Sequence, residues 1–376
     1  MIYFDNASTT KVNKKVLDTY LDANASFFAN PNSIHHLGME VNNKINKEKD
    51  KVLSLLKLSS RDYEVIYTSS ATEANNLAII GYCLKNKNKG NHIITTKIEH
   101  ASVLECFKVL EKEGFEVSYL NVNENGQIDI EEFKKTIKSS TIFASIMPVN
   151  NEVGLKLNIK EIKEVIKNYP KCVLHVDAAQ TLGKAKFDYS LGDLITISSH
   201  KIYGLKSIAA LIIKKKINLS PIINGGGQEY NLRSGTQDYP LIVSFTVAIE
   251  DILRNFEKNY AKVHLIFEFL TNELSKNPEI SLNTYKDQCE YILNFSLLNK
   301  KSSVVVEALS NKEIYVSSVS ACSSKKEEPS YVLLALNKSL NEAKNSIRLS
   351  FGEENTLEEA KIFINELNDI LKNIRS

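Results

Sequence analysis

The chain has 376 residues, enough for one large and one smaller domain, because a single hydrophobic core rarely grows beyond about 250–300 residues. Its 47 basic and 45 acidic residues nearly cancel, which excludes a general attraction to nucleic acid or to an anionic membrane. No apolar stretch reaches the length of a membrane span, and the first residues lack the basic and apolar regions of a signal peptide. The five cysteines are scattered, which argues against a disulfide framework or a zinc site, and we expect a cytoplasmic protein with reduced thiols.

Strand and helix signals alternate through the first part of the chain. The order is strand 64–67, helix 71–84, strand 92–95, helix 102–113, strand 115–120, strand 141–147 and helix 158–168. Two further apolar runs, 173–176 and 195–197, have the pattern of buried strands. We therefore expect an α/β fold, with a mostly parallel central sheet covered by helices.

The pattern changes near residue 249. A long helical segment runs from there to residue 276, and shorter strand signals follow at 291–295 and 347–350, before a last helix from about residue 356. We expect a large domain at residues 14–255. Residues 1–13 and 256–376 are expected to form a smaller α+β domain.

Polar side chains follow several of the predicted strands, at the edge where open α/β sheets bind ligands. Residues 68–74 carry hydroxyl groups before a helix, whose N-terminus can hold a phosphate. His100 can stack on a flat ring or move protons, and the asparagines in residues 148–154 can donate to a ring hydroxyl or a carboxylate. Taken singly, a helix cap and a surface histidine are the commoner explanations, and nothing local decides whether the asparagines only form a turn.

Asp177 and Lys201 give a more specific signal. A carboxylate that closes a buried strand is costly without a partner, and a lysine directly after a strand is unusual. Together they are the two groups that pyridoxal phosphate needs, because lysine holds its aldehyde as a Schiff base and a carboxylate keeps its ring nitrogen protonated. Taken alone, Lys201 is equally well explained as a lysine that reaches the surface.

Two later segments carry further candidates. The glycines at residues 225–227 lead into residues 233–236, a loop that can wrap a phosphate, although a glycine run is a weak signal. Cys322 stands in a polar segment beside lysines, a poor place to bury an apolar side chain. An exposed thiol near lysines is partly thiolate, so we interpret Cys322 as a reactive cysteine.

Taken together, these residues resemble the cysteine desulfurases, the NifS/IscS-like branch of the class V aminotransferase superfamily. The resemblance covers nearly the whole chain in order, at residues 3–10, 30–35, 71–73, 99–100, 150–154, 176–180, 199–204, 233–236, 320–323, 328–333 and 347–350. It implies a homodimeric enzyme of fold type I that uses pyridoxal 5'-phosphate to convert L-cysteine to L-alanine. The chain departs from the family pattern at Ser70, Leu205, Ser207 and Val319, none of which is a reacting group.

The resemblance also implies a role for individual residues. Lys201 would carry the cofactor as an aldimine, Cys322 would take the sulfur as a persulfide, and His100 would be a third catalytic residue that stacks on the ring. The implied cofactor contacts are Ala71, Thr72, His100, Asn151, Asp177, Gln180, Ser198, His200, Lys201 and, from the other subunit, Thr236. The implied substrate contacts are Asn30, Asn151 and Arg348. No resident metal is implied, beyond a transient contact of Cys322 with an iron–sulfur cluster.

Other functions stay open. One is another class V enzyme, such as a selenocysteine lyase or an aminotransferase, and a second is a catalytically weak scaffold of a sulfur-transfer pathway. The implied sulfur acceptor is a protein, either an iron–sulfur scaffold or a tRNA-thiolating enzyme, and the sequence favours neither. We expect no direct contact with nucleic acid or membrane.

Overall fold

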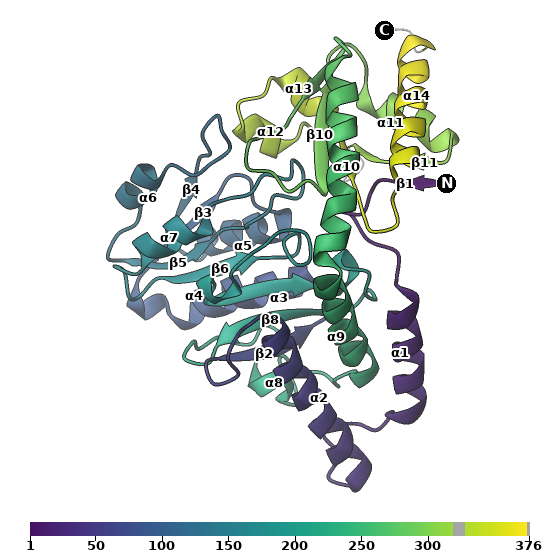
Figure 1. Cartoon of the computed structure of the whole chain (residues 1–376). Coiled ribbons are helices and arrows are strands. Elements are labelled where there is room, and N and C mark those ends of the chain that lie inside the picture. Colours follow the sequence, from purple (N-terminus) through teal and green to yellow (C-terminus); the bar gives the residue numbers. More distant parts are fainter. Residues whose placement is uncertain (319–327, 374–376) are drawn as a thin grey trace.

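The computed structural model describes residues 1–318 and 328–373, so Cys322 and Val319 lie outside the described residues (Figure 1). Over these ranges, the largest layer is a seven-stranded sheet in the spatial order β2-β8-β7-β6-β5-β3-β4. Its strands are β2 Tyr63–Thr68, β3 His92–Thr96, β4 Glu116–Leu120, β5 Thr141–Ser145, β6 Val173–Asp177, β7 Leu194–Ser198 and β8 Ala209–Lys214. Strand β8 runs antiparallel to both neighbours, while β3 to β7 pair in parallel. The mostly parallel sheet predicted from the sequence is confirmed.

Helices cover both faces of this sheet, because side chains of successive strand residues point to opposite sides. Ile93 belongs to the apolar cluster under α3, α4 and α5, whereas its neighbour Ile94 belongs to the cluster under α1, α2, α7 and α9. The helices of this region are α1 Lys14–Ser26, α2 His36–Leu55, α3 Ala71–Asn76, α4 Tyr82–Lys85, α5 Ala101–Lys112, α6 Ile130–Thr136, α7 Ile159–Ile166, α8 Gln228–Asn231 and α9 Tyr239–Arg254. The helix predicted at residues 71–84 contains a π-helical segment, Leu77–Gly81, between α3 and α4.

The C-terminal part has its own sheet, in the order β12-β13-β10-β9, with antiparallel pairing. Its strands are β9 Ile280–Leu282, β10 Ile292–Leu297, β12 Ser317–Ser318 and β13 Ser346–Ser350. The helices around it are α10 Phe256–Ser275, α11 Ser302–Asn311, α12 Tyr331–Ala335, α13 Leu340–Lys344 and α14 Leu357–Asn373. The single long helix predicted for residues 249–276 is wrong, because α9 ends and α10 begins on either side of Asn255.

The first residues of the chain lie against this C-terminal part. Strand β1, Ile2–Tyr3, pairs in parallel with β11, Ile314–Tyr315, and Phe4 is fully buried among the apolar side chains of α10, α14 and β10. This separate apolar cluster agrees with the predicted domain division, which stays a prediction. Within the described ranges, none of the helices combines the length and the apolar composition that crossing a membrane requires.

Candidate active site

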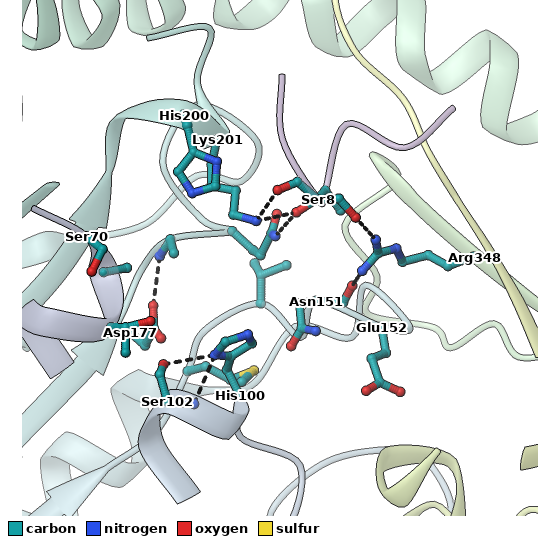
Figure 2. A pocket seen from close by; sticks show the side chains of 17 residues that line it. Ser8, Ser70, His100, Ser102, Asn151, Glu152, Asp177, His200, Lys201 and Arg348 are labelled. Carbon is teal, nitrogen blue, oxygen red and sulfur yellow. Dashed lines mark hydrogen bonds between the residues drawn. The ribbon is translucent and has the colours of Figure 1, made fainter. Parts of the chain in front are cut away.

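A pocket of about 360 Å³ lies beyond the carboxyl ends of the parallel strands, where open α/β sheets bind ligands (Figure 2). The loops after β2, β3, β5, β6 and β7 line it, together with the N-terminal segment and β13. It brings together nine of the predicted site residues: Ala71, Thr72, His100, Asn151, Asp177, Gln180, His200, Lys201 and Arg348.

Three other predicted site residues lie elsewhere. Ser198 is buried at the end of β7, and its Oγ has no hydrogen-bond partner among the described residues. Thr236 lines a different cavity, beside Arg233, and Asn30 is exposed, with its Oδ1 accepting from the Asn32 N–H. The structure of this one chain therefore does not bring Thr236 and Asn30 into the pocket.

Lys201 ends a short helical turn that follows β7. Its Nζ donates to the carbonyl oxygens of Ala7 and Ser8, each at 2.7 Å, so the N-terminal segment holds the amine inside the pocket (Figure 2). The turn needs glycine after it, because a Cβ on Gly204 would lie 2.0 Å from the Oγ of Ser199.

Two of the departures from the family pattern have a visible structural consequence. Ser70 has extended backbone and caps α3, since its Oγ accepts from the Glu73 N–H at 3.1 Å. Ser207 instead has a φ of 65°, a left-handed conformation that costs a residue with a Cβ about 1 kcal/mol. The serine at position 70 fits its place, and the one at position 207 is strained.

Asp177 has an ordered environment on the cofactor side of the pocket. It is 7% exposed, its Oδ2 accepts from Nδ2 of Asn75 at 2.8 Å, and its Oδ1 accepts from the Ala179 N–H at 3.1 Å. Sequence reasoning missed Asn75, whose only signal was a polar residue on the buried side of a helix.

His100 lies on the floor of the pocket as drawn in Figure 2. Its side chain is exposed to the open pocket, and desolvation by the surrounding protein lowers the pKa of the imidazole. The Asp177 carboxylate raises that pKa, whereas the nearby Lys201 and Arg348 charges lower it further. At His200, burial and the Lys201 charge lower the pKa to about 4, so this imidazole is neutral at physiological pH.

A second lysine lies behind the pocket wall and was also missed. Nζ of Lys184 donates to Oε1 of Gln180 at 2.7 Å, and Nε2 of Gln180 donates to the carbonyl of Ala7 at 2.9 Å. Burial and the charge of Lys201 lower the pKa of Lys184 to about 7. Because Lys184 donates to the amide oxygen of Gln180, the NH₂ group of that amide faces Ala7.

Arg348, on β13, lies on the side of the pocket opposite Asp177 (Figure 2). Its Nη2 donates to Oδ1 of Asp5 at 2.9 Å and to Oγ of Ser8 at 2.6 Å, and its Nη1 donates to the carbonyl of Asn151 at 3.0 Å. Its Nε is buried without a partner among the described residues. An N–H group in this state is available to an incoming carboxylate.

Glu152 lies next to this arginine and lines the same pocket. Burial raises the pKa of its carboxyl to about 7, although Ser330 donates a hydrogen bond to it. Sequence reasoning placed Glu152 in a motif but gave it no role.

The pocket fits pyridoxal phosphate on observations within it. Lys201 offers an amine for the aldehyde, and Asp177 offers a buried carboxylate for a protonated ring nitrogen. The start of α3 at Ala71 and Thr72 offers donors for the phosphate.

Comparisons with known proteins agree with this chemistry. The family model for class V aminotransferases matches residues 2–363. The cysteine desulfurase IscS 1 of Archaeoglobus fulgidus is 36% identical over 100% of this chain and 98% of its own length. The cysteine desulfurase IscS of Rickettsia typhi is 40% identical over 97% of this chain and 89% of its own. A solved structure described as a NifS-like protein superposes with a TM-score of 0.92 at 32% identity, covering 99% of this chain and 100% of that one.

The chain therefore belongs to the class V aminotransferase family, whose enzymes depend on pyridoxal phosphate. Within this family it is a cysteine desulfurase of the NifS/IscS-like type.

Proposed function

We propose that this enzyme removes sulfur from free L-cysteine, leaves L-alanine, and passes the sulfur from Cys322 to an acceptor protein. The observation that carries the proposal is the meeting of Lys201, Asp177 and Arg348 in one pocket, since these side chains match an aldehyde, a pyridine nitrogen and an α-carboxylate.

Pyridoxal 5'-phosphate supplies an aldehyde that bonds to amines and a ring that accepts electrons from a broken bond. Asp177 would hold its ring nitrogen and Gln180 its ring oxygen. Lys201 would hold the aldehyde. Its phosphate would lie against Ala71, Thr72, Ser198 and His200.

The chain's own residues then orient the substrate and move protons. Arg348 binds the substrate carboxylate and fixes which bond faces the ring. Lys201, which lines the pocket, would act as the acid and base at the α-carbon of the substrate. The carbonyls of Ala7 and Ser8 accept hydrogen bonds from the Lys201 amine.

Cys322 lies outside the described residues, and the residues on both sides of it support its role. Ser317 and Ser318 pair with Arg348 and Ile347 in the β12–β13 ladder, and Ser330 donates to Glu152 in the pocket. The chain thus enters and leaves residues 319–327 next to the pocket. The Cys322 thiolate attacks the substrate sulfur, the carbon–sulfur bond breaks with its electrons going to the carbon, and a proton there completes alanine. The sulfur stays on Cys322 as a persulfide.

We further propose a homodimer, in which Thr236 and Asn30 of each subunit serve the pocket of the other. The location of both residues away from this chain's own pocket supports that assignment. The sulfur acceptor is an iron–sulfur scaffold or a tRNA-thiolating enzyme. Labelled sulfur loaded on Cys322 and chased in cell extract identifies which protein receives it.

The central test measures cofactor and product together. The purified protein is expected to be yellow and to form alanine and sulfide from L-cysteine with a thiol reductant. The Lys201→Ala variant should lose the absorbance band, and Cys322→Ala should keep it but lose at least about 100-fold in alanine formation. Cys172→Ala is the matched control, because Cys172 precedes β6 at the end of the strand away from the pocket. A colourless wild type supplied with cofactor, or a Cys322→Ala variant with normal alanine formation, would overturn the proposal.

A further inference from the structure

His100 is the N-cap of α5, and this fixes the protonation of one ring nitrogen. The backbone N–H of Ser102 donates to Nδ1 of His100 at 3.1 Å. A backbone amide can only donate, so Nδ1 accepts this bond and carries no proton. In the neutral imidazole the proton is then on Nε2, the nitrogen that does not face the helix.

A second donor reaches the same Nδ1 and originates at Asp177. The carboxylate of Asp177 can only accept, so the Asn75 amide must turn its NH₂ group toward it. The second hydrogen of that NH₂ group points to Oγ of Ser102, at 2.9 Å. Because Ser102 Oγ accepts there, its own hydrogen is left to donate to Nδ1 of His100, at 2.8 Å.

The charges around His100 also act against its protonation. The N-terminus of α5, a helix of 12 residues, carries positive potential at the capping side chain. Lys201, after β7, and Arg348, on β13, add positive charge, while Asp177, on β6, is the opposing carboxylate. The Asp177 charge itself favours protonation of the ring, but through Asn75 and Ser102 the same carboxylate orients a donor toward Nδ1.

We propose that His100 remains neutral and presents Nε2–H to the pocket as a hydrogen-bond donor, with Asn75 and Ser102 as positioning residues that fix this tautomer. The inference rests on the proposed function and narrows it. An imidazole held in this way accepts no proton from the substrate, because the lone pair on Nδ1 accepts hydrogen bonds from Ser102. Proton transfer in the pocket then falls to Lys201, and His100 contributes a fixed donor.

The tautomer can be read directly by nitrogen NMR on the holoenzyme with ¹⁵N-labelled histidine. The chain has seven histidines, and the His100 signals are those missing from His100→Gln. We expect Nδ1 to report an unprotonated nitrogen and Nε2 a protonated one, unchanged from pH 6 to pH 9. In Ser102→Ala the His100 signals should begin to titrate in this range, because one of the two donors to Nδ1 is gone.

The matched control is Ser118→Ala, whose hydroxyl contacts Nε2 of His92 at 2.9 Å, away from the pocket. It should change the His92 signals and leave those of His100 as in the wild type. A protonated Nδ1 on His100, or titration of the wild-type ring between pH 6 and pH 9, would overturn the inference.

Steady-state kinetics distinguish whether His100 donates a hydrogen bond or takes up a proton. Glutamine can place an amide N–H near the position of Nε2 but cannot take up a proton. We expect His100→Ala to lower kcat about 100-fold and His100→Gln to lower it less than about tenfold. Equal losses in the two variants would refute the donor role. The NMR result does not depend on sulfur release, so failure of the proposed function would appear separately, as missing alanine in the wild type.

Discussion

The two sides of the pocket are built differently. On the Asp177 side, the carboxylate and its partner Asn75 come from β6 and α3, neighbouring parts of the central sheet region. Both Asp177 oxygens accept hydrogen bonds, although Oδ1 of Asn75 is buried without a partner among the described residues. On the Arg348 side, the N-terminal segment, the loop after β5 and the C-terminal sheet meet, and two buried atoms, Nε of Arg348 and Oδ1 of Asn151, lack a partner within the described residues.

This difference matches how long each ligand stays bound, since the cofactor stays on the Asp177 side and the substrate leaves the Arg348 side at every turnover. A carboxylate whose two oxygens both accept hydrogen bonds from the protein is preorganised for a cofactor that stays. A guanidinium with an unused buried N–H carries a cost that an incoming carboxylate relieves, which suits a substrate that is bound and released at every turnover.

Replacing Arg348 tests this contrast with the largest expected effect. Arg348→Lys keeps the charge but loses the planar fork that binds a carboxylate through two N–H groups. We expect kcat/KM for L-cysteine to fall about 100-fold, mainly through KM, while the cofactor absorbance stays unchanged because the Asp177 side is intact. Steady-state kinetics and a spectrum of the same sample check both statements. A KM within threefold of the wild type, or a lost absorbance band, would show that the two sides are not separate.

The sequence reached the residues whose signal is local. Asp177 and Lys201 each close a strand, and the structure brings both into the pocket. Asp5 gave no such signal, because its role depends on Arg348, 343 residues away in the chain. The spacing of residues in a sequence does not predict which carboxylate pairs with which guanidinium. Only the folded structure shows that pair.

The fold shows the same limit. Apolar runs predicted six of the seven strands of the sheet, because each of these runs is buried by its own composition, whereas β8 was not predicted. The antiparallel direction of β8 and the break at Asn255 are set by packing between distant segments, so the sequence pattern did not contain them. Asn75 falls between these cases. A fully buried asparagine in a helix needs a hydrogen-bond partner, but the sequence does not predict that this partner is Asp177.

Replacing Asp5, on the Arg348 side, should change KM less than Arg348→Lys does and in the opposite direction. Its carboxylate pairs with the guanidinium that would bind the substrate, so it competes for the same charge. Asp5→Asn keeps an oxygen that can accept from Nη2 but removes the negative charge. We expect KM for L-cysteine to fall by about tenfold or less, since the pair is partly exposed to solvent.

The control for this variant is Ser8→Ala, which removes the other acceptor of Nη2 without changing any charge. It should not lower KM. A rise in KM for Asp5→Asn would mean that Asp5 positions the arginine rather than competing for it.

Glu152 gives a test of stability rather than of activity. Burial raises the pKa of its carboxyl from 4.5 to about 7, so the folded protein holds this proton where the unfolded chain has lost it. Folding stability therefore falls as pH rises from about 4.5 to about 7, and above this window the ionised Glu152 carries the full cost. Glu152→Gln keeps an oxygen for the Ser330 hydroxyl and cannot ionise, so the holoenzyme variant should be about 3 kcal/mol more stable than the wild type at pH 8 and equal to it near pH 4.5.

Unfolding followed at both pH values, at one protein concentration, measures this difference. Glu164→Gln is the control, because that exposed carboxylate pairs with Lys167 on the surface and should give no gain that grows with pH. A Glu152→Gln gain that is the same at both pH values would show that the carboxyl is not held protonated by burial. A gain confined to high pH would show that the substrate side of the pocket is maintained at a cost to the fold. Nε of Arg348 and Oδ1 of Asn151, which lack a partner in the part of the chain that the structure describes, indicate the same cost.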